Sequence, residues 1–166
     1  MSVPTTSCTE DTVLAEVLID APRSVVWAAL TEARLLAAWW GSPDTYRADQ
    51  WSIDLRVGGK WESRGTSVDG SQFSVAGEFV RISPVDRLVM TWKPSWVSTP
   101  PTTIDYALVD EGRSTRLRMT HSGFSGYAAS RDNHASGWKQ VLGWLGAFAE
   151  RQAAAATGGM DGGELE

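Results

Sequence analysis

The stretch SGWKQVLGWLGAFA (Ser136–Ala149) decides the fold class of this chain. Its apolar side chains recur at the spacing of one helix face, at Trp138, Val141, Leu142, Leu145, Phe148 and Ala149. This stripe predicts an amphipathic helix that begins near Ser136 and runs for roughly 15–18 residues. At 1.5 Å per residue such a helix is about 25 Å long, enough to cross a sheet.

Upstream of this helix the sequence shows mainly strand signals, with alternating apolar residues between turn residues. Strands are predicted at 12–20, 47–55, 59–65, 72–82, 87–93, 102–110 and 114–121. Turn pairs such as Asp69-Gly70 separate the last six, which predicts antiparallel pairing in a meander. The 72–82 strand has apolar residues on both faces, so either face could point inward.

Two short helices are predicted between the first and second strands. Pro22 suits a first helical turn, and Val25, Val26, Ala29 and Leu30 follow at helical spacing. A second stripe, Leu35, Leu36, Trp39 and Trp40, ends before Gly41. The predicted fold is therefore α+β, with a curved antiparallel sheet wrapped around a long C-terminal helix.

The two ends of the sequence differ from the middle in composition. Residues 1–11 are small and polar, and residues 153–166 are rich in Ala and Gly, so both segments are predicted to be loose, flexible tails. Residues 12–152 contain no linker-like stretch or internal repeat. They are predicted to form a single domain.

Composition argues against several classes of function. The net charge is −5 with no Lys/Arg-rich run, which argues against nucleic acid as a partner. A single cysteine, Cys8, permits no intrachain disulfide, and no stretch resembles a signal peptide or membrane span. A cytoplasmic protein without membrane contact is expected. Asp132, His134 and a remote Cys8 do not make a metal site, so neither metal nor cofactor is expected.

Six segments, in order along the chain, resemble one known family. They are Ala21–Thr31, Leu35–Gly41, Ile53–Trp61, Arg87–Trp92, Ser114–His121 and Gly137–Leu142. Over roughly residues 13–152 the chain resembles the START-like (SRPBCC) helix-grip superfamily, and within it the proteins similar to the activator of the 90-kDa heat-shock protein ATPase. The resemblance implies a helix-grip fold. It leaves the activity open, because this superfamily includes lipid carriers, hormone binders, polyketide cyclases and cochaperone domains.

Nine tryptophans indicate broad aromatic walls inside the protein. We expect a cavity between the sheet and the C-terminal helix that binds a small hydrophobic or aromatic ligand, with the Trp39-Trp40 segment as one lip. The candidate ligand-binding residues are Trp39, Trp40, Trp51, Trp61, Phe79, Met90, Trp92, Tyr106, Met119, His121, Trp138 and Leu142. The alternative interpretation is that these side chains fill a solid core.

Other functions remain open at this point. An enzyme of cyclase or hydrolase type could use His121 as an acid or base, which would need a partner such as Glu78, although the sequence favours a binding protein and assigns no catalytic residue. A surface that binds a chaperone is a third hypothesis. Trp96, in a proline-bounded loop, and Trp144 lie away from the predicted core positions and favour a homodimer interface.

Overall fold

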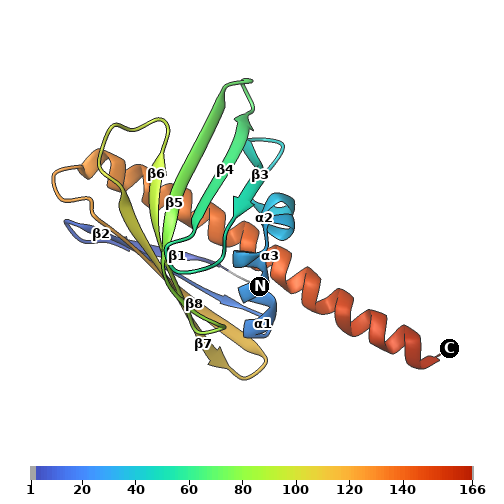
Figure 1. The fold of residues 1–166 in the computed structure, drawn as a ribbon. Helices are drawn as coiled ribbons and strands as arrows, with labels where there is room; N and C mark the ends of the chain where they lie inside the picture. The colour runs from blue at the N-terminus through green and yellow to red at the C-terminus, as the bar shows by residue number, and fades with distance from the viewer. Residues whose placement is uncertain (1–2, 166) are drawn as a thin grey trace.

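The computed structural model describes residues 3–165, with side chains described for residues 3–156. One antiparallel sheet curves around a long helix (Figure 1). Its strands are β1 (Thr5–Cys8), β2 (Thr12–Ile19), β3 (Tyr46–Ile53), β4 (Lys60–Ser67), β5 (Gln72–Ser83), β6 (Arg87–Pro94), β7 (Thr102–Glu111) and β8 (Ser114–Ser122). The helices are α1 (Arg23–Thr31), α2 (Ala33–Trp39) and α3 (Ala128–Leu165). The predicted α+β helix-grip fold is confirmed.

The order of strands across the sheet is β1-β2-β8-β7-β6-β5-β4-β3. β3 to β8 form the predicted meander, and β2 joins it beside β8 with Val17 opposite Leu117. The seven predicted strands correspond to β2–β8, and their ends differ from the observed ends by at most two residues.

The segments predicted as tails both contain regular secondary structure. Within the predicted N-terminal tail, β1 pairs with β2, from Thr5 opposite Glu16 to Cys8 opposite Val13. Its side chains are largely exposed, so no apolar alternation marks it in the sequence. At the other end, α3 begins at Ala128, earlier than Ser136, and continues to Leu165 through the predicted flexible segment. Alanine, abundant there, has the highest helix propensity of all residues.

A β-bulge in β5 explains why its inward face was ambiguous. Phe79 pairs with Met90 of β6, but Arg81 pairs with Val89, so β5 carries one extra residue at this point. The extra residue reverses the alternation of faces. As a result Val75 and Phe79 point inward before the bulge, and Ile82 packs against the core after it.

The indole of Trp61 lies over a position where only glycine fits. Trp61 pairs with Gly77 across β4 and β5, and its Nε1–H donates to the carbonyl oxygen of Thr91 at 3.2 Å. A Cβ atom on Gly77 would lie 1.9 Å from that carbonyl oxygen and 2.6 Å from the indole nitrogen. Gly77 therefore permits a large aromatic ring to lie against the sheet.

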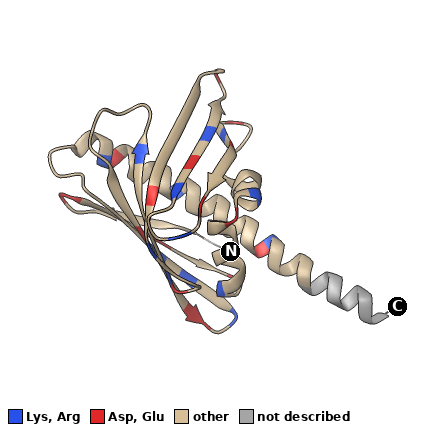
Figure 2. Cartoon of the chain, viewed as in Figure 1, with Lys and Arg blue, Asp and Glu red and all other residues tan. Residues whose placement is uncertain are grey.

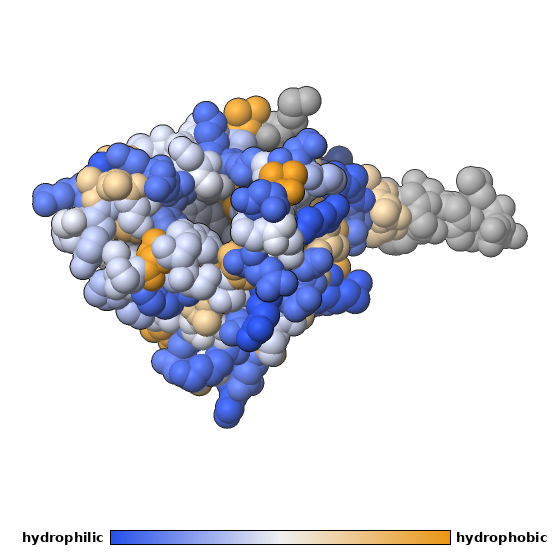
Figure 3. Space-filling view, turned by 90° about the horizontal axis from the view of Figure 1, so that it is seen from above, coloured by the Kyte–Doolittle hydropathy of each residue, from blue (hydrophilic) through white to orange (hydrophobic). Residues whose placement is uncertain are grey.

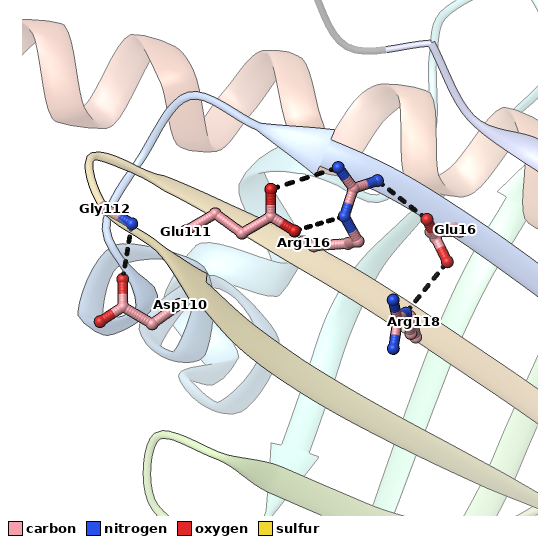
Figure 4. A network of polar contacts seen from close by, with 6 residues as sticks. All are labelled: Glu16, Asp110, Glu111, Gly112, Arg116 and Arg118. Carbon is pink, nitrogen blue, oxygen red and sulfur yellow. Dashed lines mark hydrogen bonds and ion pairs between the residues drawn. The ribbon is translucent and has the colours of Figure 1, made fainter.

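Charged side chains occupy the outer face of the sheet. Arg116 donates to Glu16 at 2.8 Å and to Glu111 at 2.5 Å, and Arg118 donates to the second oxygen of Glu16 at 3.1 Å (Figure 4). Residues of both signs are spread over the strands and helices (Figure 2). The inner face, by contrast, is apolar and aromatic, and the candidate site lies there.

Candidate functional site

The structure gathers the predicted tryptophans into one cluster around Trp40. Its ring centroid lies 5.0 Å from that of Trp39, 5.3 Å from Trp51, and 6.1 Å from both Trp92 and Trp138. These separations are typical of favourable aromatic pairs. Residues from α2, β3, β6 and α3 thus meet inside the curve of the sheet.

The deep side of this cluster is almost filled. A space of about 20 Å³ remains there, enough for about one water molecule. Seven candidate residues line it, namely Trp40, Trp51, Trp61, Phe79, Met90, Trp92 and Tyr106. Burial raises the pKa of the Tyr106 hydroxyl, which therefore stays protonated. On this side the aromatic side chains form packed core.

A much larger cavity, of about 550 Å³, lies on the other side of the cluster, between β3–β6 and the first half of α3. It is lined by Trp40, Tyr46, Ala48, Ser63, Ser67, Ser71, Gln72, Phe73, Val75, Trp92, Trp96, Asn133, His134, Gly137, Trp138 and Val141. Trp40 and Trp92 line both spaces and separate them. Figure 3 shows one face of the molecule hollowed near its centre.

The large cavity includes only part of the predicted site. Trp40, Trp92 and Trp138 line it. The candidates that line neither space are buried, namely Trp39, Met119, His121 and Leu142. The indole of Trp39 points away and donates to the carbonyl oxygen of Ala29 at 2.9 Å.

The mouth of the large cavity is bordered by residues outside the predicted lip. The exposed lining residues are Ser71 and Gln72 near the β4–β5 turn, Trp96 in the 95–101 loop, and Asn133 in α3. The Trp39-Trp40 segment is buried instead. It forms part of the inner wall through Trp40.

Sequence reasoning missed several lining residues. Tyr46 and Phe73 lie at strand ends, where alternation is a weak guide, and Ser63 and Gly137 carry no apolar signal. Trp96 did give a signal, an aromatic residue between prolines with no core role. It is 55% exposed and meets Phe73 edge to face at 6.0 Å.

Two histidines lie at the cavity wall, with ring centroids 5.1 Å apart: His134 is half-buried and lines the cavity, and His121 is buried behind it. The Nε1–H of Trp138 donates to Nδ1 of His121 at 2.9 Å, and the Nε1–H of Trp92 donates to Nε2 of His134 at 3.1 Å. Each histidine therefore accepts at one nitrogen and carries its proton on the other. Those protons bond Thr102 Oγ1, at 2.6 Å from His121, and the Ser130 carbonyl oxygen, at 2.8 Å from His134.

This network requires both imidazoles to be neutral. Burial lowers the pKa of His121 well below its usual value, and the nearby His134 lowers it further. Burial also lowers the pKa of His134, although its bond to Ser130 opposes that shift. A second proton on either imidazole would point at the indole N–H that already donates to that nitrogen, so two donors would face each other. The histidines thus hold Trp92 and Trp138 in place, and all four ring nitrogens are bonded to protein.

Two hydroxyl groups give the cavity its inner polar character. Ser63 is 3% exposed and lines the cavity, and its hydroxyl has no hydrogen-bond partner among residues 3–156. Tyr46 Oη accepts from Trp40 Nε1 at 3.3 Å, so its own O–H is free to donate. Both hydroxyls can bond a polar group of a bound molecule.

Residues 20–150 match the family model described as "Activator of Hsp90 ATPase homolog 1-like protein". The chain belongs to this family. The match covers most of the chain and agrees with the START-like helix-grip architecture described above. No curated protein matches the chain.

Solved structures share the fold of this family member. Protein NE0264 from Nitrosomonas europaea is 21% identical, with a TM-score of 0.75 over 89% of this chain and 99% of the other. Protein CV1439 from Chromobacterium violaceum is 22% identical, with a TM-score of 0.73 over 86% and 99%. CalU16 from Micromonospora echinospora is 22% identical, with a TM-score of 0.65 over 92% and 87%. At these identities the likeness shows the fold alone.

Two further observations concern metals and membranes. Within residues 3–156, no three side chains of His, Cys, Asp or Glu come together as a metal site would require. None of the helices in the described part of the chain has the length and apolar character needed to cross a bilayer.

The unpartnered hydroxyl of Ser63 leads to a stability prediction. Ser63→Ala removes no hydrogen bond, so we expect the free energy of unfolding to change by less than about 0.5 kcal/mol. Thr115→Val is the matched control, because the equally buried Thr115 hydroxyl donates to the Ala21 carbonyl oxygen at 2.8 Å. It should cost about 1–2 kcal/mol. Urea denaturation measures both, and equal losses would contradict a free hydroxyl at Ser63.

Proposed function

We propose that this protein binds a small, uncharged and largely aromatic molecule in the cavity of about 550 Å³ between β3–β6 and α3. The supporting observation is the wall of this cavity, which contains six aromatic side chains, from Trp40, Tyr46, Phe73, Trp92, Trp96 and Trp138. Small-molecule sites are usually apolar cavities of about 300–1,000 Å³ with a few placed polar groups. The volume and the lining both fit that description.

The polar groups of the wall favour a ligand without charge. Among residues 3–156, no Asp, Glu, Lys or Arg lines the cavity, and partial burial lowers the pKa of its one basic lining residue, His134. A charged ligand would lose its hydration without gaining a partner of opposite charge. Hydroxyl or carbonyl groups can instead bond Ser63 and Tyr46 at the inner end.

The geometry supports ligand binding better than it supports acid–base catalysis by His121. His121 is 0% exposed, and both of its nitrogens bond to Trp138 and Thr102. Glu78, a partner considered for it, lies on the outer surface at 3.5 Å from Lys60. A general base must reach the proton that it removes, and His121 is separated from the cavity by the wall.

Trp96→Ala tests the proposal at the mouth of the cavity. Trp96 is largely exposed, so its removal should leave the fold intact, while a ligand loses contact area with one wall. For the neutral fluorescent probe N-phenyl-1-naphthylamine we expect the Kd to rise about 5- to 20-fold, equivalent to about 1–2 kcal/mol. Fluorescence titration of the full chain measures this change.

The matched control is Tyr127→Ala, because Tyr127 is 40% exposed and does not line the cavity. It should leave the Kd unchanged. If the wild type binds no probe from a panel of neutral aromatics, or if both variants weaken binding equally, the proposed site is wrong. Native mass spectrometry of the protein as purified would identify a natural ligand that remains bound.

The predicted contacts with other proteins stay predictions. Trp96, expected at a homodimer interface, lies at the cavity mouth, and Trp144 is half-buried with its ring 5.6 Å from that of Tyr46. The family name describes an activator of a chaperone ATPase, and a chaperone contact for this chain rests on that name alone.

A further inference from the structure

Gly137 occupies an unusual place in the wall of the large cavity. It lies well inside α3, between Asn133 and Val141, which are one turn away on either side and line the same cavity. Glycine inside a helix is unfavourable relative to alanine, because it loses more conformational freedom on folding. A glycine at such a position therefore needs a physical reason.

The usual reasons do not apply to Gly137. Its φ is not positive, in contrast to Gly41 and Gly126 among others, so any residue could adopt its backbone conformation. Apart from its two chain neighbours and the backbone of α3 itself, no atom of the described residues lies within 4 Å of the place where a Cβ would stand, so close packing against other elements does not exclude a side chain. This differs from Gly77, where a Cβ would collide with the carbonyl oxygen of Thr91. The space beside Gly137 is open, and it belongs to the cavity.

The missing side chain leaves a slot on the surface of α3. Asn133 and Val141 bound the slot along the helix, and Trp138 and His134 lie beside it. Hydrogen bonds fix both of these side chains, because Trp138 donates to His121 and His134 accepts from Trp92. Phe73, Val75 and Trp96 line the same cavity from the sheet side. A flat ring entering the slot would lie against the helix backbone.

We propose that Gly137 is the residue that sets the size of ligand this cavity accepts, by leaving room for an aromatic ring against α3. The inference rests on the proposed function. The ligand class that it selects is a neutral molecule of more than two fused or linked rings, because a smaller molecule would not need the slot.

Substitutions at Gly137 test this inference, with two neutral probes of different size, 2-naphthol and N-phenyl-1-naphthylamine. Gly137→Ala should weaken binding of the larger probe about 3- to 10-fold and leave binding of 2-naphthol nearly unchanged. Gly137→Leu should weaken binding of the larger probe at least 30-fold. Gln140→Leu is the control, because Gln140 is exposed on α3 and does not line the cavity. It should bind both probes like the wild type.

Thermal unfolding separates the loss of ligand space from damage to the fold. Gly137→Ala should raise the Tm by about 2–4 °C, because alanine favours the helix and no clash opposes it. Gly143→Ala is the matched control in the same helix, where the nearest atom to an added Cβ is 3.9 Å away, in Pro4. It should raise the Tm similarly without changing the Kd of either probe.

The possible outcomes distinguish the two proposals. If the wild type binds both probes and the folded Gly137→Ala and Gly137→Leu variants bind them equally well, the role of Gly137 is wrong and the proposed function stands. If the wild type binds neither probe, both proposals are overturned. If Gly137→Leu does not fold, the difference between Gly137→Ala and Gly143→Ala in probe affinity decides.

Discussion

Acidification from pH 7 to pH 5 is expected to lower the free energy of unfolding by about 2–4 kcal/mol. The cause is the pair of neutral histidines, His121 and His134, whose pKa values burial lowers below the ordinary value of 6.5. Below pH 6.5 the unfolded chain binds protons at both residues, but the folded chain resists them. Stability that is complete above pH 6.5 is therefore lost as the pH falls.

The size of the effect follows from the number of protons. If both histidines stay neutral in the folded state, the free energy of unfolding falls by up to about 2.7 kcal/mol per pH unit. If His134 is protonated in the folded state at a higher pH than His121, the total loss lies nearer about 2 than about 4 kcal/mol. The bond from His134 to the Ser130 carbonyl favours the protonated form and makes His134 the easier of the two to charge. Urea denaturation at half-unit pH intervals measures the slope.

The two carboxyl groups with shifted pKa values, those of Asp69 and Glu111, titrate below this range. Glu111 is bonded by Arg116, which lowers the pKa of its carboxyl below the ordinary value of 4.5, so it remains ionised in folded protein throughout. His134→Gln serves as the control variant. The introduced amide oxygen can still accept the hydrogen bond from Trp92. The free energy of unfolding of this variant should depend less on pH, because one titrating group is gone. A free energy of unfolding that does not vary between pH 7 and pH 5 would contradict the neutral network.

The sequence predicts the sheet well because its strands carry local signals. Inward apolar residues recur at every second position, at Ile104, Tyr106 and Leu108 of β7 and at Leu117 and Met119 of β8. The turn at Gly112-Arg113 separates the two strands. β1 carries no such signal, because it is held mainly by backbone pairing with β2. The start of α3 was missed for the same reason. Its first two turns contain no buried residue, so the apolar stripe begins only later.

The site could be predicted only as a group of residues. Alternation correctly placed Trp61, Trp92 and Tyr106 on the inner face, but it does not tell which inner side chains touch one another and which face open space. That division depends on volumes and on indole orientation. Trp40 separates a filled region from an open one, while Trp39, its neighbour in sequence, points to Ala29. Part of the cavity is open because Gly137 has no side chain. The spacing of apolar residues in the sequence does not indicate such a gap.

Trp138→Ala is expected to be the most damaging single change in the cavity wall, at about 3–5 kcal/mol in the free energy of unfolding. The Trp138 ring is 3% exposed and meets Trp40, Trp92 and Tyr106 at centroid distances of about 6 Å. Its removal also leaves Nδ1 of His121 without a donor, in a place where burial makes a missing hydrogen bond costly.

Trp138→Phe separates the two contributions. It keeps an aromatic ring in the wall but removes the N–H, so it should cost about 1–3 kcal/mol, chiefly from the unpaired nitrogen of His121. It should also weaken the pH dependence, because a proton on Nδ1 of His121 no longer meets an indole N–H. Trp96→Ala, the same truncation at an exposed tryptophan, should cost less than about 0.5 kcal/mol. Urea denaturation of the three variants at pH 7 orders these losses, and a Trp138→Ala loss no larger than that of Trp96→Ala would show that the wall does not depend on this side chain.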